Sequence, residues 1–308
     1  MYFTIDFKNI FLYTLIVMKL EYVVDKLSKY ENVKQVLKEE FFISDRLIIK
    51  LKKSKQIYLN NLPAFINQEL KINDIICVDL DFEETCDNIV PTKINLDILY
   101  EDDALIIINK LPFMPVHPSM DHYEDSLSNG VKYYFNSINL KRKIRPVNRL
   151  DKNTSGIVIF AKNEYIQECL VKQMKSNIFA KEYIAVLDGI IDKTKQIIDV
   201  PIARKENSII ERCVNSAGDN AVTIMQLIKS FNNYSLVKCI LKTGRTHQIR
   251  VHTAYIGHPI LGDDLYGQKT DLINRQALHA HKIKFVHPIT KNKIEIEAKI
   301  PNDIKKLI

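Results

Sequence analysis

Apolar residues recur at helical spacing near the start of the chain. Four of them are spaced i, i+3, i+4 and i+8, namely Val33, Val36, Leu37 and Phe41. This spacing predicts a helix with one buried face. A second helix is expected to begin after Ser44, a residue type that favours the N-cap position. One face of this helix is apolar, and another is basic, being formed by Arg46, Lys50 and Lys53 at i, i+4 and i+7.

Short apolar runs follow these helices and predict strands. Residues 57–59, the Asn60-Asn61 turn and the apolar residues beyond it are typical of a hairpin, and residues 75–80 form another strand candidate. Two helices, a hairpin and a strand predict a small α/β module over residues 18–82. The polar residues 83–95 show no periodicity and contain Pro91, so we interpret them as a linker.

The rest of the chain predicts a larger domain over residues 96–308. Its apolar runs at 105–108, 156–161, 183–187 and 236–241 are typical of strands buried on both faces. Residues 246–256 predict a helix, which Gly257 can close. The expected fold class is α+β, with a mixed, mostly antiparallel central sheet flanked by helices.

Composition and charge narrow the class of protein. The chain has 308 residues, a hydrophobic fraction of 46% and a formal net charge of +7. The modest positive charge suits a polyanionic partner, and it equally suits a Lys-rich solvated surface. The five cysteines are scattered and form no CxxC pair, which disfavours zinc and disulfide frameworks and favours a cytoplasmic location.

The first residues differ in character from those that follow. The apolar run at 11–17 is too short to span a bilayer, and no small-residue cleavage site follows it. Met18 directly precedes the first expected domain. We therefore interpret residues 1–17 as an upstream extension without a structural role.

Two segments carry candidate chemistry. The segment NRLDKNTSG at residues 148–156 is polar and leads directly into a buried strand, which suits Asp151 as a nucleophile or base. On residue types alone, a turn-forming role for Asp151 is the more common one. The segment TGRTHQIRVH at 243–252 combines a glycine turn, a helix start, two arginines and two histidines, which suits an anion site or a solvated basic face.

Other polar residues give weaker signals. Tyr183 begins a strand after Lys181-Glu182, a position at which tyrosine usually packs. His279, His281 and His287 lack a cysteine or carboxylate at metal-ligand spacing, so we expect no metal site.

The chain resembles the RluA-type pseudouridine synthases through five motifs in the same order. Residues 148–156 resemble the signature HRLDxxTSG. The other motifs are NKPxGxxVHP at 109–118, KxYxAxVxG at 181–189, TGRTHQIRVH at 243–252 and LHAxxLxFxHPxT at 278–290. Residues 19–82 are similar, more loosely, to the RNA-binding domain named after ribosomal protein S-four. The matches to the synthase motifs cover about residues 96–300.

The resemblance implies an isomerase that converts uridine to pseudouridine in RNA without a cofactor or metal. It implies that Asp151 is the catalytic carboxylate, as nucleophile or base, that Arg245 pairs with it, and that Tyr183 stacks on the target base. Arg149 would fill the space left by a flipped base. Further RNA contacts are expected from Asn148 and Arg250, and from Arg46, Lys50 and Lys53 on the N-terminal module.

Some alternatives stay open at this level. Asn148 stands where the family has histidine, and Leu111 replaces a proline of the NKPxG stretch. The main alternative to a synthase is a non-catalytic RNA-binding or ribosome-assembly protein on the same fold. A hydrolase that uses Asp151 as nucleophile is a third hypothesis. Large-subunit ribosomal RNA is the expected substrate, with transfer RNA next, and the protein is expected to be a monomer without a membrane partner.

Overall fold

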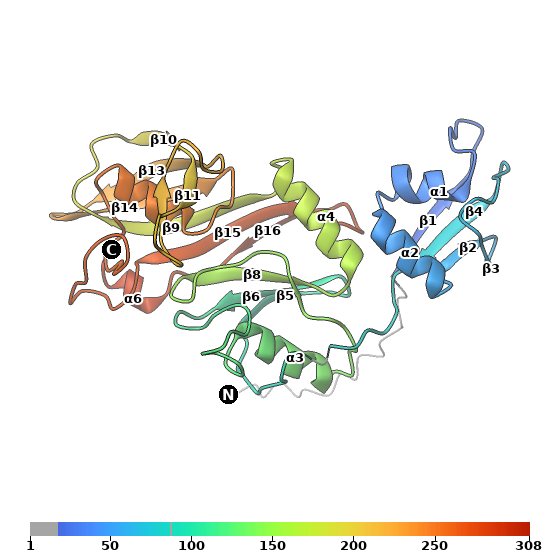
Figure 1. Ribbon diagram of the computed structural model, residues 1–308, viewed down its shortest axis with the longest axis horizontal. Coiled ribbons are helices and arrows are strands. Elements are labelled where there is room, and N and C mark those ends of the chain that lie inside the picture. Colours follow the sequence, from blue (N-terminus) through green and yellow to red (C-terminus); the bar gives the residue numbers. More distant parts are fainter. Residues whose placement is uncertain (1–17, 87) are drawn as a thin grey trace, which may run out of the picture. The chain divides into compact units, whose positions relative to one another are not determined.

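The computed structural model describes residues 18–86 and 88–308, so the proposed extension at 1–17 lies outside the described residues. Contacts within the chain divide it into two compact units, with the division between Phe82 and Glu83. We refer to residues 18–82 as unit 1 and to the described residues from Glu83 onward as unit 2 (Figure 1).

Unit 1 packs two helical segments on a four-stranded sheet of order β1-β4-β2-β3. The strands are β1 (Lys19–Val23), β2 (Ile57–Leu59), β3 (Leu62–Pro63) and β4 (Ile75–Asp79). The first expected helix is present as α1 (Val33–Gln35), which continues as a π-helical turn, η1 (Val36–Glu40). The second is α2 (Asp45–Lys53), and the Ser44 side chain caps it by accepting a hydrogen bond from the Leu47 amide.

The hairpin and the basic helix face of unit 1 have the expected form. Asn60 and Asn61 both have positive φ, the conformation that a tight two-residue turn between β2 and β3 requires. Leu47, Ile48 and Leu51 of α2 are buried, whereas Arg46 and Lys53 are exposed and Lys50 is half-buried beside the Phe82 ring. The amphipathic pattern of α2 is therefore confirmed.

Unit 2 is built on a ten-stranded sheet whose main path is β10-β13-β14-β9-β15-β8-β6-β5. Its first strands are β5 (Ile98–Glu101), β6 (Leu105–Lys110), β7 (Arg145–Pro146), β8 (Ser155–Ala161) and β9 (Ala180–Asp188). The others are β10 (Lys195–Asp199), β13 (Val222–Ser230), β14 (Tyr234–Leu241), β15 (Leu278–Val286) and β16 (Lys293–Glu297). Only the pairing of β8 with β15 is parallel among the described strand pairs, so the expected mixed, mostly antiparallel sheet is confirmed.

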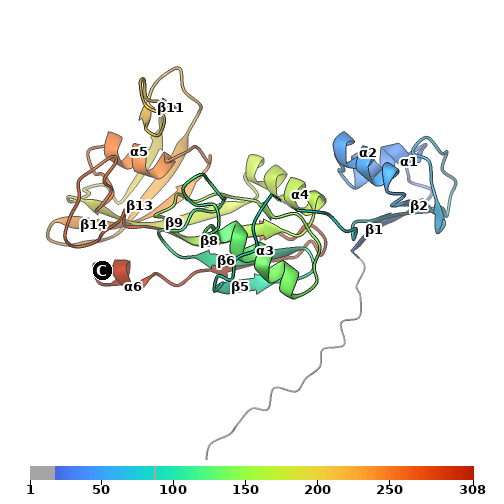
Figure 2. The same ribbon diagram turned by 60° about the horizontal axis from the view of Figure 1, so that its bottom comes forward.

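Two helices cover the part of the sheet around β8. In Figures 1 and 2, α3 (Leu127–Ser137) and α4 (Glu164–Lys175) lie on opposite faces of the sheet. Helix α3 packs its apolar residues against Ile106 and Ile108 of β6 and Val158 and Phe160 of β8. All seven residues of β8 are buried, which confirms the expectation of strands covered on both faces.

The chain enters β8 through a close backbone contact. Gly156 has φ +113°, and a Cβ atom built on it would lie 2.2 Å from the carbonyl oxygen of Ala280 in β15. Only glycine fits at this point, because both the backbone conformation and the space exclude a side chain. Gly156 therefore allows β8 to pair with β15 directly after the segment that contains Asp151.

Within the described residues of 83–95, several polar groups bind other parts of unit 2, which the linker interpretation did not predict. Within the described part of this segment there is no helix or strand, but its polar groups are bound to unit 2. Glu84 forms a buried two-pronged ion pair with Arg145, at 2.6 and 2.8 Å, and the Thr92 amide donates to the carbonyl of Asn129. A lack of periodicity does not distinguish a linker from an irregular segment held by side-chain partners.

A two-stranded hairpin of unit 2 stands apart from the main sheet. It consists of β11 (Ile202–Arg204) and β12 (Arg212–Val214) and lies beside α5 (Gln248–Tyr255), as Figure 2 shows. Ile202 and Val214 pack with Val251 of α5 in a small apolar cluster. Helix α5 begins at Gln248 rather than at the expected residue 246, because His247 has a left-handed conformation with φ 57°.

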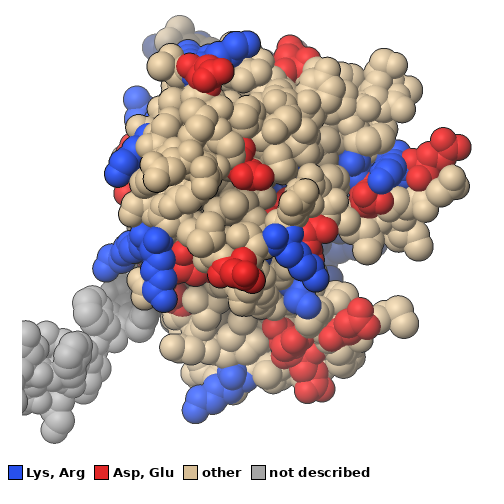
Figure 3. Space-filling model, turned by 90° about the vertical axis from the view of Figure 1, so that its left-hand side faces the viewer, with Lys and Arg blue, Asp and Glu red and all other residues tan. Residues whose placement is uncertain are grey.

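The surface of unit 2 carries charged side chains of both signs. On the face shown in Figure 3, basic and acidic side chains are interspersed and much of the surface is uncharged. A net charge of +7 therefore does not by itself locate a polyanion site. Among the helices of residues 18–86 and 88–308, none combines the length and the apolar character that a bilayer crossing requires.

Candidate active site

Asp151 lies at the surface of a pocket in unit 2, in the loop between β7 and β8. The pocket is also lined by Arg149, Tyr183, Arg245 and Arg250, so the structure brings together residues that are far apart in the sequence. The Asp151 side chain is 27% exposed, which leaves its carboxylate accessible to a ligand in the pocket.

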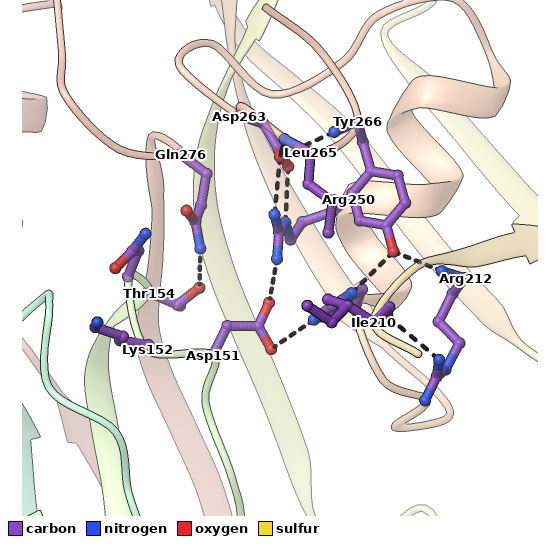
Figure 4. A network of polar contacts seen from close by, with 12 residues as sticks. Asp151, Lys152, Thr154, Ile210, Arg212, Arg250, Asp263, Leu265, Tyr266 and Gln276 are labelled. Carbon is purple, nitrogen blue, oxygen red and sulfur yellow. Dashed lines mark hydrogen bonds and ion pairs between the residues drawn. The ribbon is translucent and has the colours of Figure 1, made fainter. Parts of the chain in front are cut away.

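Arg250 is the arginine that pairs with Asp151. Its Nη1 atom donates to Asp151 Oδ2 at 3.1 Å, as Figure 4 shows. The family resemblance implied Arg245 in this position, and the structure corrects that expectation. Arg245 is exposed and directs its guanidinium to the carbonyl of Asn220 and, at 3.5 Å, to the carboxylate of Asp219. The two arginines differ because Arg245 precedes α5, whereas Arg250 lies on its buried face.

Arg250 is itself held by a buried carboxylate. Its Nε and Nη2 atoms donate to the two oxygens of Asp263 at 2.7 and 2.8 Å, and Asp263 has no exposed side-chain surface. Two-pronged pairing of this kind fixes the plane of the guanidinium. The two carboxylates raise the pKa of Arg250 against the effect of burial. Arg250 was expected to contact RNA, but its 7% exposure and these partners leave it as an internal support of Asp151.

His247 and Tyr266 complete the network beside Asp151. The Tyr266 hydroxyl accepts a hydrogen bond from the Arg212 amide and lies 2.8 Å from His247 Nδ1. The hydroxyl can then donate its own proton to Nδ1, which places the ring hydrogen on Nε2, 3.8 Å from Asp151 Oδ1. Burial lowers the pKa of His247, so the ring is neutral at pH 7.

Tyr183 borders the same pocket from β9. Its ring is buried, and burial together with the Asp151 charge raises the pKa of its hydroxyl above the ordinary value of 10. The phenol is therefore protonated at neutral pH and presents an uncharged O–H group and an aromatic ring. The family resemblance implied that Tyr183 stacks on the target base, and Tyr183 lines the same pocket as Asp151.

The loop around Asp151 is held by three buried side chains from two distant segments. Lys110 donates to the carbonyl of Lys152 at 3.0 Å, Arg275 to the carbonyl of Asn153 at 3.0 Å, and Gln276 to the Thr154 hydroxyl at 3.2 Å. All three side chains are almost inaccessible to solvent. The loop is thus attached to rigid parts of unit 2 on the C-terminal side of Asp151, which restricts where the carboxylate can move.

Asn148, which was expected to contact RNA, supports the loop on the N-terminal side of Asp151. Its side-chain amide donates to the carbonyl of Ile157 at 3.0 Å and accepts from the amide of Ile159 at 2.9 Å. Because both ends of the amide bind β8, Asn148 acts as a strand partner in this structure. A neutral asparagine serves that purpose, so its difference from the family histidine leaves the loop intact.

His279 lies beneath the loop, with Nδ1 2.9 Å from the Ser155 hydroxyl. Burial lowers the pKa of His279 from 6.5 to about 4. The folded state therefore binds fewer protons here than the unfolded state between pH 6.5 and 4, and its stability falls as the pH decreases through that range. We expect His279 to account for a loss of about 2 kcal/mol in the free energy of unfolding between pH 7 and pH 5.

Urea denaturation at the two pH values measures this effect. His279→Gln removes the titrating group, so this variant is expected to lose less stability on acidification than the wild type. His258→Gln, at a histidine that binds the carbonyl of Asp188 elsewhere in unit 2, serves as the control. An equal pH dependence in His279→Gln and the wild type would contradict the assignment.

Several residues of this site were missed or assigned no role by sequence reasoning. These are Lys110, His247, Asp263, Tyr266, Arg275 and Gln276. Most lie within or beside the motif segments, but their hydrogen bonds join residues that are up to 122 positions apart. Within the described residues, no group of three or more His, Cys, Asp or Glu side chains is arranged to hold a metal.

Comparison with known proteins places this geometry in a family. Residues 104–255 match the family model described as RNA pseudouridylate synthase. The protein YjbO of Bacillus subtilis, described as an uncharacterized RNA pseudouridine synthase, is 36% identical over 270 residues, which cover 87% of this chain and 95% of the relative. Ribosomal large subunit pseudouridine synthase D of Blochmanniella floridana is 32% identical over 313 residues, which cover 94% of this chain and 93% of the relative.

A solved structure agrees with the assignment. Human RNA Pseudouridylate Synthase Domain Containing 1 superposes with a TM-score of 0.56 and 25% identity, covering 67% of this chain and 83% of the human chain. The matched range of this chain includes Asp151, Tyr183 and Arg250, which meet at the pocket described above. The chain therefore belongs to the RluA-type family of RNA pseudouridine synthases.

Proposed function

We propose that this protein converts one or more uridines of large-subunit ribosomal RNA to pseudouridine, with Asp151 as the reacting carboxylate. One observation carries the proposal. The Asp151 carboxylate is accessible in a pocket, and Arg250 together with the hydrogen-bonded loop fixes its position. The name of the Blochmanniella floridana relative supports the choice of ribosomal RNA, and transfer RNA is the second substrate class. We also propose that the protein acts in the cytoplasm as a monomer.

The proposed reaction is an isomerisation that conserves all atoms. The bond between the ribose carbon 1′ and uracil N1 breaks, the base rotates, and a bond forms between carbon 1′ and uracil carbon 5. The hydrogen on carbon 5 leaves as a proton, and N1 gains a proton. No oxidant, reductant or cofactor enters this balance, because the uracil serves first as the leaving group and then as the attacking group.

The residues around the pocket suit the steps of this reaction. Asp151 either adds to carbon 1′ or removes a ribose proton, and both roles need a carboxylate close to the sugar. Tyr183 offers an aromatic face for the uracil and a protonated hydroxyl. Arg149 is exposed at the pocket, two residues before Asp151, and its planar head is suited to fill the stack that a flipped base leaves.

Tritium release tests the proposed activity. Transcripts of ribosomal and transfer RNA are labelled with tritium on carbon 5 of uridine and incubated with the full-length protein. We expect release from large-subunit ribosomal RNA, and fragment mapping then locates the modified uridine. Release only from transfer RNA would change the substrate class. Binding of these RNAs without any release would instead support a non-catalytic RNA-binding protein.

Unit 1 is proposed to bind RNA through the basic face of α2, in the manner of the domain named after ribosomal protein S-four. Replacing Arg46, Lys50 and Lys53 together with Ala is expected to weaken RNA binding. Each basic side chain that neutralises a phosphate adds about 0.7 to the slope of log K against log salt, so removing all three should reduce the slope by about 2.

Filter binding at several salt concentrations measures this slope. The matched control removes three exposed lysines of unit 2, with Lys193, Lys195 and Lys299 replaced by Ala. Equal slopes for the α2 variant and this control would exclude a phosphate-binding role for α2.

A further inference from the structure

We infer that a second pocket of unit 2 binds a backbone phosphate of the nucleotide that adjoins the target uridine. This inference rests on the proposed function. The pocket has a cavity volume of about 410 Å³ and contains four arginines, namely Arg149, Arg204, Arg212 and Arg245. We call it the arginine pocket. Arg204 and Arg212 lie outside the five family motifs.

The arginine pocket adjoins the Asp151 pocket. Arg149 and Arg245 line both of them, so a chain that places one nucleotide beside Asp151 can place its neighbour in the pocket that the four arginines line. This continuity favours RNA over a free anion or an acidic peptide. The two shared arginines come from the Asp151 loop and from the segment before α5.

The β11–β12 hairpin supplies the other two arginines. Arg204 and Arg212 are directly opposite each other in the antiparallel register of the hairpin. Side chains at such positions lie on the same face, and like charges placed there repel. An anion bound between the two would remove this repulsion. The carboxylate of Glu211 does not serve this purpose, because it pairs with Lys205 at 2.9 Å.

The charge of the arginine pocket is strongly positive. Among the described residues that line it, the only acidic one is Asp219, which lies 3.5 Å from Arg245 and is largely exposed. Four positive groups and one negative group leave a net charge of +3. Arginine is the side chain best suited to bind phosphate through paired N–H groups.

The hairpin is fixed in place by the catalytic network. An isolated two-stranded hairpin is marginally stable in water. Here the Tyr266 hydroxyl accepts a hydrogen bond from the Arg212 amide at 2.8 Å. The Tyr266 ring packs against the guanidinium of Arg250, the partner of Asp151 (Figure 4). Gly218 lies so close to Ile202 that a Cβ atom would meet its carbonyl carbon at 2.4 Å. The arginine pocket is therefore formed before RNA binds, and its position relative to Asp151 is fixed.

The test uses the uridine mapped by tritium release and the variant Arg204→Gln/Arg212→Gln. These changes keep the backbone amide of Arg212 that binds Tyr266. We expect RNA affinity to fall at least about tenfold and the salt slope to fall by about 1, while kcat at saturating RNA stays within about twofold of the wild type. The control Lys193→Gln/Lys195→Gln removes the same charge from exposed positions of unit 2 and should leave affinity within about twofold.

A neutral methylphosphonate identifies the contact. Placed beside the target uridine, it should weaken binding to the wild type but cause little further loss in the double variant. Equal sensitivity of the two proteins to this substitution would overturn the inference, as would a double variant that behaves like the lysine control. In both cases tritium release by the wild type would still support the proposed function. A wild type that releases no tritium from any RNA would instead overturn the proposed function and, with it, this inference.

Discussion

Replacing Asp151 with Asn is expected to lower pseudouridine formation by more than about a thousandfold, as a catalytic carboxylate contributes at this level. Asparagine has nearly the same shape and can still accept a hydrogen bond from Arg250. It cannot carry the negative charge that addition to carbon 1′ or removal of a ribose proton requires. Tritium release under single-turnover conditions measures the loss directly, without the contribution of product release.

Two further measurements separate a lost reaction from a lost fold. Asp151 is partly exposed, and Arg250 keeps Asp263 as a partner, so Asp151→Asn should change the free energy of unfolding by less than about 1 kcal/mol. RNA affinity should also be retained. Asp192→Asn, at an exposed aspartate, is the matched control and should be fully active. Activity above about a tenth of the wild type in Asp151→Asn would assign the reaction to another group.

Asp151→Glu tests how closely the carboxylate must be placed. The added methylene moves the charge by about 1 Å, which can cost roughly a hundredfold in rate when a site is tightly positioned. The loop is held by Lys110, Arg275 and Gln276, so it should not adjust to the longer side chain. Activity close to that of the wild type would show that the loop is softer than these contacts imply.

Replacing Arg250 with Met is expected to destabilise the protein by about 3–5 kcal/mol, because it leaves the Asp263 carboxylate buried without its charged partner. Activity should fall as well, by roughly a hundredfold, since Asp151 loses the group that orients it. Urea denaturation and single-turnover tritium release measure the two effects on the same samples.

A double variant separates the two roles of Arg250. In Arg250→Met/Asp263→Leu, the unpaired buried charge is gone, so much of the lost stability should return. Activity should stay low, because Asp151 still lacks its partner. If activity returned together with stability, Arg250 would be needed only for folding. Arg245→Met tests the sequence-based assignment. It should leave stability and kcat at saturating RNA nearly unchanged and weaken RNA binding instead, because Arg245 lines the arginine pocket.

The local elements could be predicted from the sequence because their determinants are local. Apolar spacing determines the buried faces of α1, η1 and α2, and Ser44 and the Asn60-Asn61 turn mark where elements begin and reverse. The uninterrupted apolar run of β8 likewise indicated a strand covered on both faces. Motif resemblance located Asp151, Tyr183 and the segment before α5, because these residues lie in contiguous stretches.

The partners within the site could not be predicted in this way. Arg245 and Arg250 lie in the same ten-residue motif, and only the left-handed conformation of His247 and the start of α5 decide which of them faces Asp151. The sequence does not reveal that Asn148 binds the backbone of β8, so an RNA contact at the surface was expected. Likewise, the sequence of residues 83–95 is typical of a linker and does not reveal the ion pair between Glu84 and Arg145.

The sequence alone therefore determined the class of fold, the motif residues and the reaction that the family resemblance implies. Tertiary structure decided which groups act on one another, because an ion pair such as Asp151–Arg250 joins residues 99 positions apart. It also brought Arg204 and Arg212 beside Arg149 and Arg245. Periodicity records which face of an element is buried, whereas the partner across that face depends on how distant elements pack together.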